Sequence, residues 1–216
     1  MDFISAYTPD HLSFLLEGFW VTLKVAFFSI ILSFLIGGIV GTLRYAEIPV
    51  ISKVLAIMVE ITRNLPLLLI IFFAYFALPE IGVKLEVSIA AIAALTVFES
   101  AMLSEIIRSG LKSIDKGQIE AARSSGLTYV QTLWNIVLPQ ALKRMVPPIV
   151  SQFISLLKDT SLATIIALPE LMHNAQVLYA QKQSFVIPVI LIIAIMYFIV
   201  NYTLSIIARR LEVKRA

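Results

Sequence analysis

The chain of 216 residues contains no cysteine and few charged side chains, and these two absences exclude several classes of protein. Without cysteine it can form no disulfide bond and no thiolate metal site. Charged residues make up 14% of the sequence and hydrophobic residues 59%, whereas soluble domains average about 25% and about 45–50%. So much apolar surface on so short a chain indicates that its solvent is a lipid bilayer. The net charge of +3 is too small to indicate nucleic acid as a partner.

Motifs for nucleotide binding and hydrolysis are also absent. The sequence has no G-x-x-x-x-G-K-[ST] phosphate loop, no H-E-x-x-H and no G-x-S-x-G. His11 and His173 lie far apart, with no spacing that is typical of a metal site. We therefore expect no catalytic residue, no cofactor and no metal ion in this chain.

Long uncharged runs predict an all-α fold, an integral membrane bundle with five transmembrane helices in a single domain, residues 1–216. About 20 apolar residues are needed to cross the hydrocarbon core. In the first span Gly37 and Gly41 lie four residues apart, which lets another helix approach closely, and we interpret them as packing residues. The predicted spans are about 19–43, 52–78, 87–108, 145–166 and 184–208.

The fourth span is interrupted. Its uncharged run, 145–157, is too short to cross a bilayer, and Lys158 and Asp159 follow it directly. Pro147 and Pro148 are expected to bend the entry to this helix. We predict a break near 158–161, and irregular backbone at membrane depth survives only where it faces protein or a watery cavity. The break is therefore a candidate for the transport path.

The basic residues predict the orientation. Residues 105–144 hold six basic and three acidic side chains, and the tail 209–216 holds four basic and one acidic. Segment 1–18 has three acidic and no basic residues, which also predicts that no signal peptide is cleaved from it. Because cytoplasmic loops carry the excess of Lys and Arg, we expect the N-terminus outside and the C-terminus in the cytoplasm.

A polar segment of about 113–139 separates the third and fourth spans. Asp115 with Gln118, and Thr128 with Gln131, have the spacing of capping boxes that begin two helices. The two short helices are expected at about 116–125 and 129–137.

A tight turn is expected to join these two helices. Gly126 suits the left-handed residue after the first helix, and Pro139 is expected to end the second. Such a hairpin can pass force from a cytoplasmic partner to the bundle, or it can lie against the bilayer as an amphipathic element.

One motif in this hairpin distinguishes the two interpretations. Glu120-Ala121-Ala122-x-x-x-Gly126, nine residues, then Ile136-x-Leu138-Pro139 resembles the EAA loop of ABC-importer permeases. From about Gly18 to Arg210 the chain resembles the polar amino-acid uptake permeases, the importers of histidine, glutamine, glutamate and arginine. The further segments that carry the resemblance are 63–68, 104–108, 117–118 and 158–163.

The resemblance implies a type I importer core in which two permease subunits, identical or paralogous, form the pathway in the bacterial cytoplasmic membrane. It implies two ABC ATPase subunits that hold ATP and Mg²⁺, and an extracytoplasmic amino-acid-binding protein that delivers the substrate. The EAA loop would dock as a coupling helix on the ATPase. Trp134 is either an anchor at that interface or a local packing residue. The coupling residues implied are Glu120, Ala121, Ala122, Arg123, Gly126 and Trp134.

Two acidic residues inside the predicted spans are candidates for substrate binding. A charge at the bilayer centre costs about 2.5–3.5 kcal/mol on insertion scales, so Glu99 and Asp159 need a reason to be there. We hypothesise that they receive the positive group of a basic or amide amino acid; alternatively, each pairs with Lys158 or a hydroxyl and serves packing. Further polar candidates are Ser100, Gln152, Ser155, Thr160 and Ser161.

The resemblance does not extend to specificity. Where the family commonly has Arg-Gly-Thr-Pro-Leu-Leu followed by a glutamine, this chain has Asn64, Leu65 and Ile70. The particular amino acid therefore cannot be carried over from the family.

Two acid–base pairs are interpreted as structural. Glu60 with Arg63 and Glu105 with Arg108 are each three residues apart, which is the spacing of an ion pair on one helix face.

The main alternative function is a secondary transporter or channel for amino acids that needs no ATP. It predicts inverted internal repeats, and the five spans share no repeated pattern. An intramembrane enzyme would need a catalytic constellation, and none of the motifs above is present.

Overall fold

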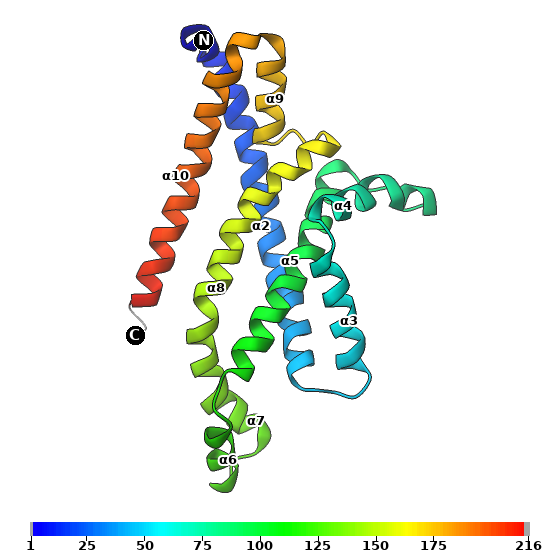
Figure 1. Ribbon diagram of the computed structural model, residues 1–216, viewed down its shortest axis with the longest axis vertical. Coiled ribbons are helices and arrows are strands. Elements are labelled where there is room, and N and C mark those ends of the chain that lie inside the picture. The colour runs from blue at the N-terminus through cyan, green and yellow to red at the C-terminus, as the bar shows by residue number, and fades with distance from the viewer. Residues whose placement is uncertain (1, 214–216) are drawn as a thin grey trace.

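A computed structural model describes residues 2–213 of the chain, which form a tall helical bundle without strands (Figure 1). The N-terminus and α9 lie at one end of the bundle, and the polar hairpin α6–α7 protrudes from the other. The α-helices are α1 Phe3–Ala6, α2 Pro9–Tyr45, α3 Ile51–Asn64, α4 Leu67–Phe72, α5 Val87–Lys112, α6 Lys116–Ser124, α7 Tyr129–Thr132, α8 Leu138–Asp159, α9 Leu171–Gln181 and α10 Val186–Val213.

Shorter turns of other geometry connect these helices. Two of them are π-helical, η1 Phe73–Ala77 and η3 Leu133–Val137. Three are 3-10 turns: η2 Leu78–Ile81, η4 Thr160–Ile166 and η5 Gln183–Phe185.

Four helical segments of the described chain are long and apolar enough to cross a membrane. They are Pro9–Tyr45, Val87–Lys112, Tyr129–Ile166 and Gln183–Ile207, and the bent pair Ile51–Asn64 and Leu67–Ile81 makes up to five. The predicted fold class, an all-α membrane bundle, is confirmed.

The first span begins earlier than the sequence suggested. α2 starts at Pro9, where the Thr8 hydroxyl accepts a hydrogen bond from His11 N at 3.3 Å, rather than near residue 19. With 37 residues it is about 55 Å long, well beyond a hydrocarbon core of about 30 Å. A capping residue, and not the membrane edge, therefore sets its start.

The second span is not the continuous helix that was predicted over 52–78. α3 ends at Asn64, and the chain turns by 103° before α4 begins at Leu67. Leu65 has an extended backbone, with ψ at 141°, because the ring of Pro66 clashes with a helical residue before it.

The fourth span has its break at the predicted place, but Pro139 does not end a helix. α8 ends at Asp159 and continues as the 3-10 turn η4. Pro139 lies in the first turn of α8, directly after the π-helical turn η3, and a missing N–H is tolerated in a first turn. The helical path is therefore continuous from the hairpin into the membrane.

Helix α9 was not predicted. It lies beside the N-terminal half of α2 and the start of α10 (Figure 1). Leu171, Ala175 and Leu178 pack there against Leu15 and Val189 in one buried cluster.

The most extensive packing is between α2 and α5, and it confirms the packing role of two glycines. A Cβ atom on Gly37 would lie 2.9 Å from Ser100 O, and one on Gly41 would lie 2.7 Å from Ser104 O. Neither gap holds a methyl group, so these glycines let the two backbones touch. Gly38, one residue along, has no atom within 4 Å of such a Cβ.

This contrast gives a matched pair of variants. Gly41→Ala should lower the melting temperature of the detergent-purified protein, because overpacking costs about 1–3 kcal/mol. Gly38→Ala should leave it unchanged or raise it, because alanine is favoured over glycine in a helix by about 0.5–1 kcal/mol. Intrinsic fluorescence of Trp20 and Trp134 reports the transition. Equal melting temperatures for both variants would contradict the close approach.

Candidate coupling element and translocation site

The protruding hairpin is held in shape by its own turn. α6 ends at Ser124, and Gly126 follows with φ at 88°, in the left-handed region as predicted. Arg123 Nη1 donates a hydrogen bond to Leu127 O at 2.7 Å across this turn. Arg123 thus stabilises the hairpin.

Of the two predicted capping boxes, one is formed. Thr128 and Gln131 exchange both hydrogen bonds at the start of α7. Asp115 accepts from Gly117 N at 2.6 Å, but the Gln118 side chain does not return to it. Gln118 instead accepts from Gln140 Nε2 on α8, also at 2.6 Å. A tertiary partner has displaced the local one.

The hairpin is fastened to both neighbouring membrane helices. Besides the contact between Gln118 and Gln140, Arg144 Nη1 on α8 donates to Ser113 Oγ after α5, at 3.1 Å. Beneath these contacts a buried apolar cluster joins α5, η3 and α8, with Leu111, Ile114, Val137, Ala141 and Met145 among its members. A displacement of the hairpin must therefore move the ends of α5 and α8.

The free surface of the hairpin combines small and large apolar residues. Ala122 is buried beneath it, whereas Glu120 and Ala121 are exposed. Trp134 is 63% exposed, so it is not a local packing residue of this chain, and Tyr129 and Val130 are exposed beside it in sequence. Exposed apolar groups gathered on a polar element are typical of a docking surface.

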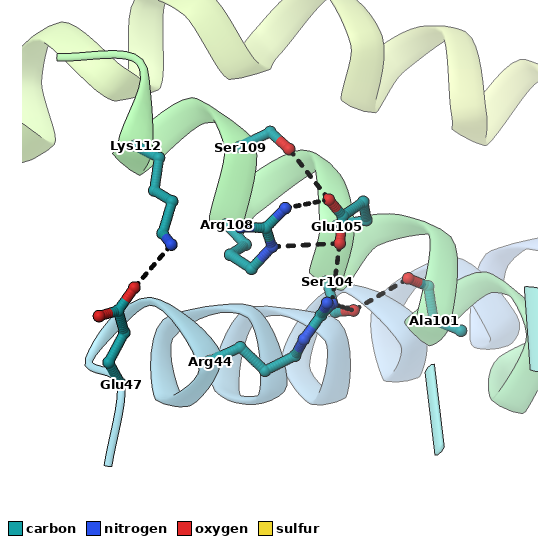
Figure 2. Close-up of polar contacts among 8 residues, drawn as sticks. All are labelled: Arg44, Glu47, Ala101, Ser104, Glu105, Arg108, Ser109 and Lys112. Atoms are coloured by element: carbon teal, nitrogen blue, oxygen red, sulfur yellow. Dashed lines mark hydrogen bonds and ion pairs between the residues drawn. The ribbon is translucent and has the colours of Figure 1, made fainter. Parts of the chain in front are cut away.

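A network of charges joins α2 and α5 near the hairpin end (Figure 2). Arg44 Nη1 lies 3.0 Å from Glu105 Oε2, and Arg108 pairs with the same carboxylate, which confirms the predicted pair of Glu105 and Arg108. Lys112 Nζ lies 2.6 Å from Glu47 Oε1 and holds the pKa of the Glu47 carboxyl below its ordinary value.

The other predicted pair, Glu60 with Arg63, is not among the ion pairs of residues 2–213. Asn64 Nδ2 donates to Glu60 Oε1 at 3.2 Å instead. This correction follows from spacing, because residues three and four apart both lie beside Glu60 on the helix.

Glu99 lies in the middle of α5 and is 1% exposed. Gln152 Nε2 on α8 donates to its Oε2 at 3.1 Å, so its partner is an amide rather than Lys158 or a hydroxyl. Its other oxygen, Oε1, has no partner among the described residues, and neither do the buried hydroxyls of Thr96 and Ser100. A buried carboxylate oxygen without a donor is costly unless a ligand or water supplies one.

Three of the remaining candidates make contacts elsewhere. Ser100 lines an apolar cavity between α2, α3 and α5, whereas Glu99 contacts α8. The hydroxyl of Thr160 donates to Leu157 O and that of Ser161 to Lys158 O, both at 2.7 Å, so both donors are used by the helix backbone.

Two candidates share a face of α8 with the amide that contacts Glu99. Ser155 and Asp159, both half-buried, lie one and two turns beyond Gln152, and a spacing of seven residues returns to the same face. This face leads from Glu99 towards the end of α8.

A further buried acid, Glu170, was missed by the sequence analysis. Fully buried at the start of α9, it accepts from His173 N at 2.7 Å and Met172 N at 2.8 Å. The hydroxyls of Tyr197 and Thr22 lie 3.3 and 3.4 Å from Oε2, so Glu170 joins α9 to α10 and α2. An acid between a proline and an apolar run is a helix-start signal that could have revealed it.

Helices long and apolar enough to span a membrane, together with a fastened polar hairpin that protrudes from one end, are the features of a membrane-spanning subunit. Residues 29–214 match the family described as the inner membrane component of binding-protein-dependent transport systems. The chain belongs to this family, which confirms the resemblance and overturns the alternative of a transporter or channel that works without ATP.

Relatives and solved structures agree with the family. A probable glutamine ABC transporter permease, GlnP of Bacillus subtilis (strain 168), is 71% identical over 217 residues, covering 100% of both chains. A second from the same organism, GlnM, is 38% identical over 94% of both chains.

The crystal structure of an amino acid ABC transporter with histidines is similar over 99% of both chains, with a TM-score of 0.91 and 28% identity. The methionine ABC transporter MetNI, at 23% identity, covers 97% of this chain and 99% of its own with a TM-score of 0.81, and shows the same fold.

The Glu170 contacts predict a loss of stability. Glu170→Ala should lower the melting temperature by several degrees, because it removes a helix cap worth about 0.5–2 kcal/mol and leaves buried donors unpaired. Glu80→Ala, at an exposed acid, is the control and should melt like the parent protein. Unchanged melting of Glu170→Ala would show that these contacts contribute nothing.

Proposed function

We propose that this chain is the permease subunit of an ATP-driven importer of polar amino acids, with glutamine as the substrate. The observation that supports glutamine as the substrate is the 71% identity over the full length to a probable glutamine permease. An amide amino acid is also one of the two substrate classes suggested by the buried acids.

The proposed partners follow from the family. Two ABC ATPase subunits bind ATP and Mg²⁺, a second permease subunit completes the pathway, and an extracytoplasmic binding protein delivers the amino acid. Basic residues at the hairpin end support a cytoplasmic position for α6–α7. The N-terminus, at the other end of the bundle, then lies outside, where the binding protein docks (Figure 1).

In the proposed mechanism the hairpin transmits closure of the ATPase pair. The exposed face around Glu120, Ala121 and Trp134 docks on the ATPase, Ala122 keeps the hairpin compact, and Gly126 and Arg123 hold its turn. The ends of α5 and α8 then move with the hairpin through Gln140 and Arg144. The pathway alternates between outward and inward access.

The proposed substrate site is centred on Glu99. Its free oxygen, Oε1, can accept an N–H from the carboxamide or the ammonium group of glutamine. Gln152 holds the other oxygen, and the face of α8 that carries Ser155 and Asp159 leads to the break at Thr160 and Ser161. Substrate passes this break on its way across the membrane.

A bulky residue on the docking face tests the function and its coupling. Proteoliposomes that contain this chain, its ATPase, its partner permease and a glutamine-loaded binding protein should take up labelled L-glutamine only when ATP is inside. Ala121→Trp should abolish this uptake and the co-purification of the ATPase, because the exposed methyl group permits the close approach.

Ala180→Trp, at an exposed alanine on α9 and far from the hairpin, is the matched control and should transport normally. Uptake without ATP, or normal uptake by Ala121→Trp, would refute the coupling mechanism.

Glu99 can be tested without breaking its contact with Gln152. Glu99→Gln keeps an acceptor for the Gln152 amide but removes the charge, and glutamine uptake should fall at least about tenfold, as expected for a lost hydrogen bond to a charged group. The basal ATPase rate and the melting temperature should stay the same. Glu80→Gln, at an exposed acid, should behave like the parent protein. If Glu99→Gln transports normally, Glu99 is structural.

A further inference from the structure

A second polar site lies outside the translocation path, at the hairpin end of the bundle. The α2–α3 connection and the base of α5 border an open cavity of 420 Å³. Three basic side chains line it, Arg44, Lys53 and Arg108, together with one acidic side chain, Glu47. None of these residues takes part in the proposed coupling or substrate contacts.

The charges around this cavity are not balanced. Glu105 pairs with both Arg44 and Arg108, and Glu47 pairs with Lys112 (Figure 2). Lys53 is exposed and forms no ion pair in the described part of the chain. Four basic side chains thus face two acidic ones, which leaves a positive site.

Arg44 has unused hydrogen-bonding capacity. Its side chain is only 9% exposed, and Nη1 makes its contacts with Ser104 and Glu105. Its Nε–H is buried and has no partner among the described residues. A buried guanidinium donor without an acceptor is a position that a ligand or an ordered water can occupy.

The start of α3 adds to the positive potential. This helix of 14 residues begins at Ile51, and no side chain caps it. The residues before and after that start, Pro49 and Ser52, line the same cavity. The N–H groups of Ile51, Ser52 and Val54 already donate to backbone carbonyl groups there, so the start of α3 contributes only its partial positive charge, which favours an anion.

An apolar groove continues from the same cleft into the bundle. A second cavity, of 200 Å³, is lined mainly by aliphatic side chains, including Val40, Leu55, Val59 and Val97. Val40 lies one helical turn before Arg44 on α2, and Leu55 is next to Ala56 of the first cavity. The cleft between α2, α3 and α5 is therefore basic at its mouth and apolar further in.

We propose that this cleft binds one phospholipid with an anionic headgroup. The phosphate would lie between Arg44, Lys53 and the start of α3, and an acyl chain would fill the groove beside Val40 and Leu55. A free phosphate ion would leave the apolar groove empty, because it has no acyl chain. A zwitterionic headgroup carries no net charge, so it would leave the excess positive charge of the site uncompensated. Basic pockets between helices on the cytoplasmic side are typical sites for anionic headgroups.

The proposal rests on the membrane orientation given above but not on the substrate. The bound lipid would join α2, α3 and α5 next to the hairpin, where α5 leads into α6. Lipid retention is measured directly and does not depend on transport. Failure of the lipid proposal with normal glutamine uptake, and failure of uptake with normal lipid retention, are therefore distinct outcomes.

The test compares lipids on the purified complex by native mass spectrometry. After delipidation, dioleoyl phosphatidylglycerol or dioleoyl phosphatidylcholine is titrated in, and glycerol phosphate serves as the headgroup without chains. We expect one phosphatidylglycerol to be retained per chain, with much weaker retention of the other two compounds. Equal retention of phosphatidylcholine, or equal binding of glycerol phosphate, would overturn the proposal.

Two variants test separately how the basic mouth and the apolar groove contribute to lipid retention. Lys53→Glu should weaken retention at least about fivefold, since one basic residue near a membrane surface contributes about 1 kcal/mol. Leu55→Trp should weaken it by filling the groove. Lys143→Glu makes the same change of charge at an exposed residue of α8 and should bind like the parent. If Lys143→Glu weakens retention as much as Lys53→Glu, the effect is general surface charge and the site is refuted.

Discussion

In a hydrocarbon solvent every backbone N–H and C=O must be satisfied within the protein, and the rest of this structure depends on that constraint. It explains why every element of the described residues is a helix or a helical turn, and why the breaks in the second and fourth predicted spans lie close together. The bend before α4 and the 3-10 turn η4 pack against one another, with Leu67, Ile71, Ala163 and Ile166 in one buried cluster. The helices that adjoin the two interruptions therefore meet in one buried cluster, although Asn64, Leu65 and Pro66 of the bend itself are exposed in the single chain.

Local patterns predicted those features that depend on neighbours in the sequence. The left-handed Gly126, the Thr128 box and the pair of Glu105 and Arg108 each involve residues at most four apart. The predictions failed where a competing partner was available, as when Gln118 turned to Gln140 on another helix. The bend at Pro66 could have been predicted from local chemistry, because the residue before a proline avoids the helical region. The position of α9 could not have been predicted in this way, because its apolar face is buried only by contact with α2 and α10.

The same distinction applies to the candidate substrate site. The position of Glu99 within an apolar predicted span identified it as a buried acid. It did not show which neighbouring helix the side chain would face. Adjacent residues on a helix point about 100° apart, and this is why Glu99 meets α8 while Ser100 lines the cleft next to α3. Contact with Gln152, 53 positions away, is a property of the packed bundle that no spacing rule contains.

Helix α5 connects the proposed functions physically. Glu99 in its middle and Lys112 at its end are 13 residues apart, about 20 Å along a rigid rod. At its base, Gly110 lies against the Met145 side chain with no room for a Cβ atom, so α5 and α8 are in close contact where the hairpin is fastened. On the other side, Arg44 holds the same helix to α2 through Glu105. A packed interface of this kind adopts a few discrete helix positions rather than a continuous range of positions, because protein interiors have few voids. In the proposed mechanism, movement of the hairpin therefore shifts α5 and α8 together, and with them the contact between Glu99 and Gln152.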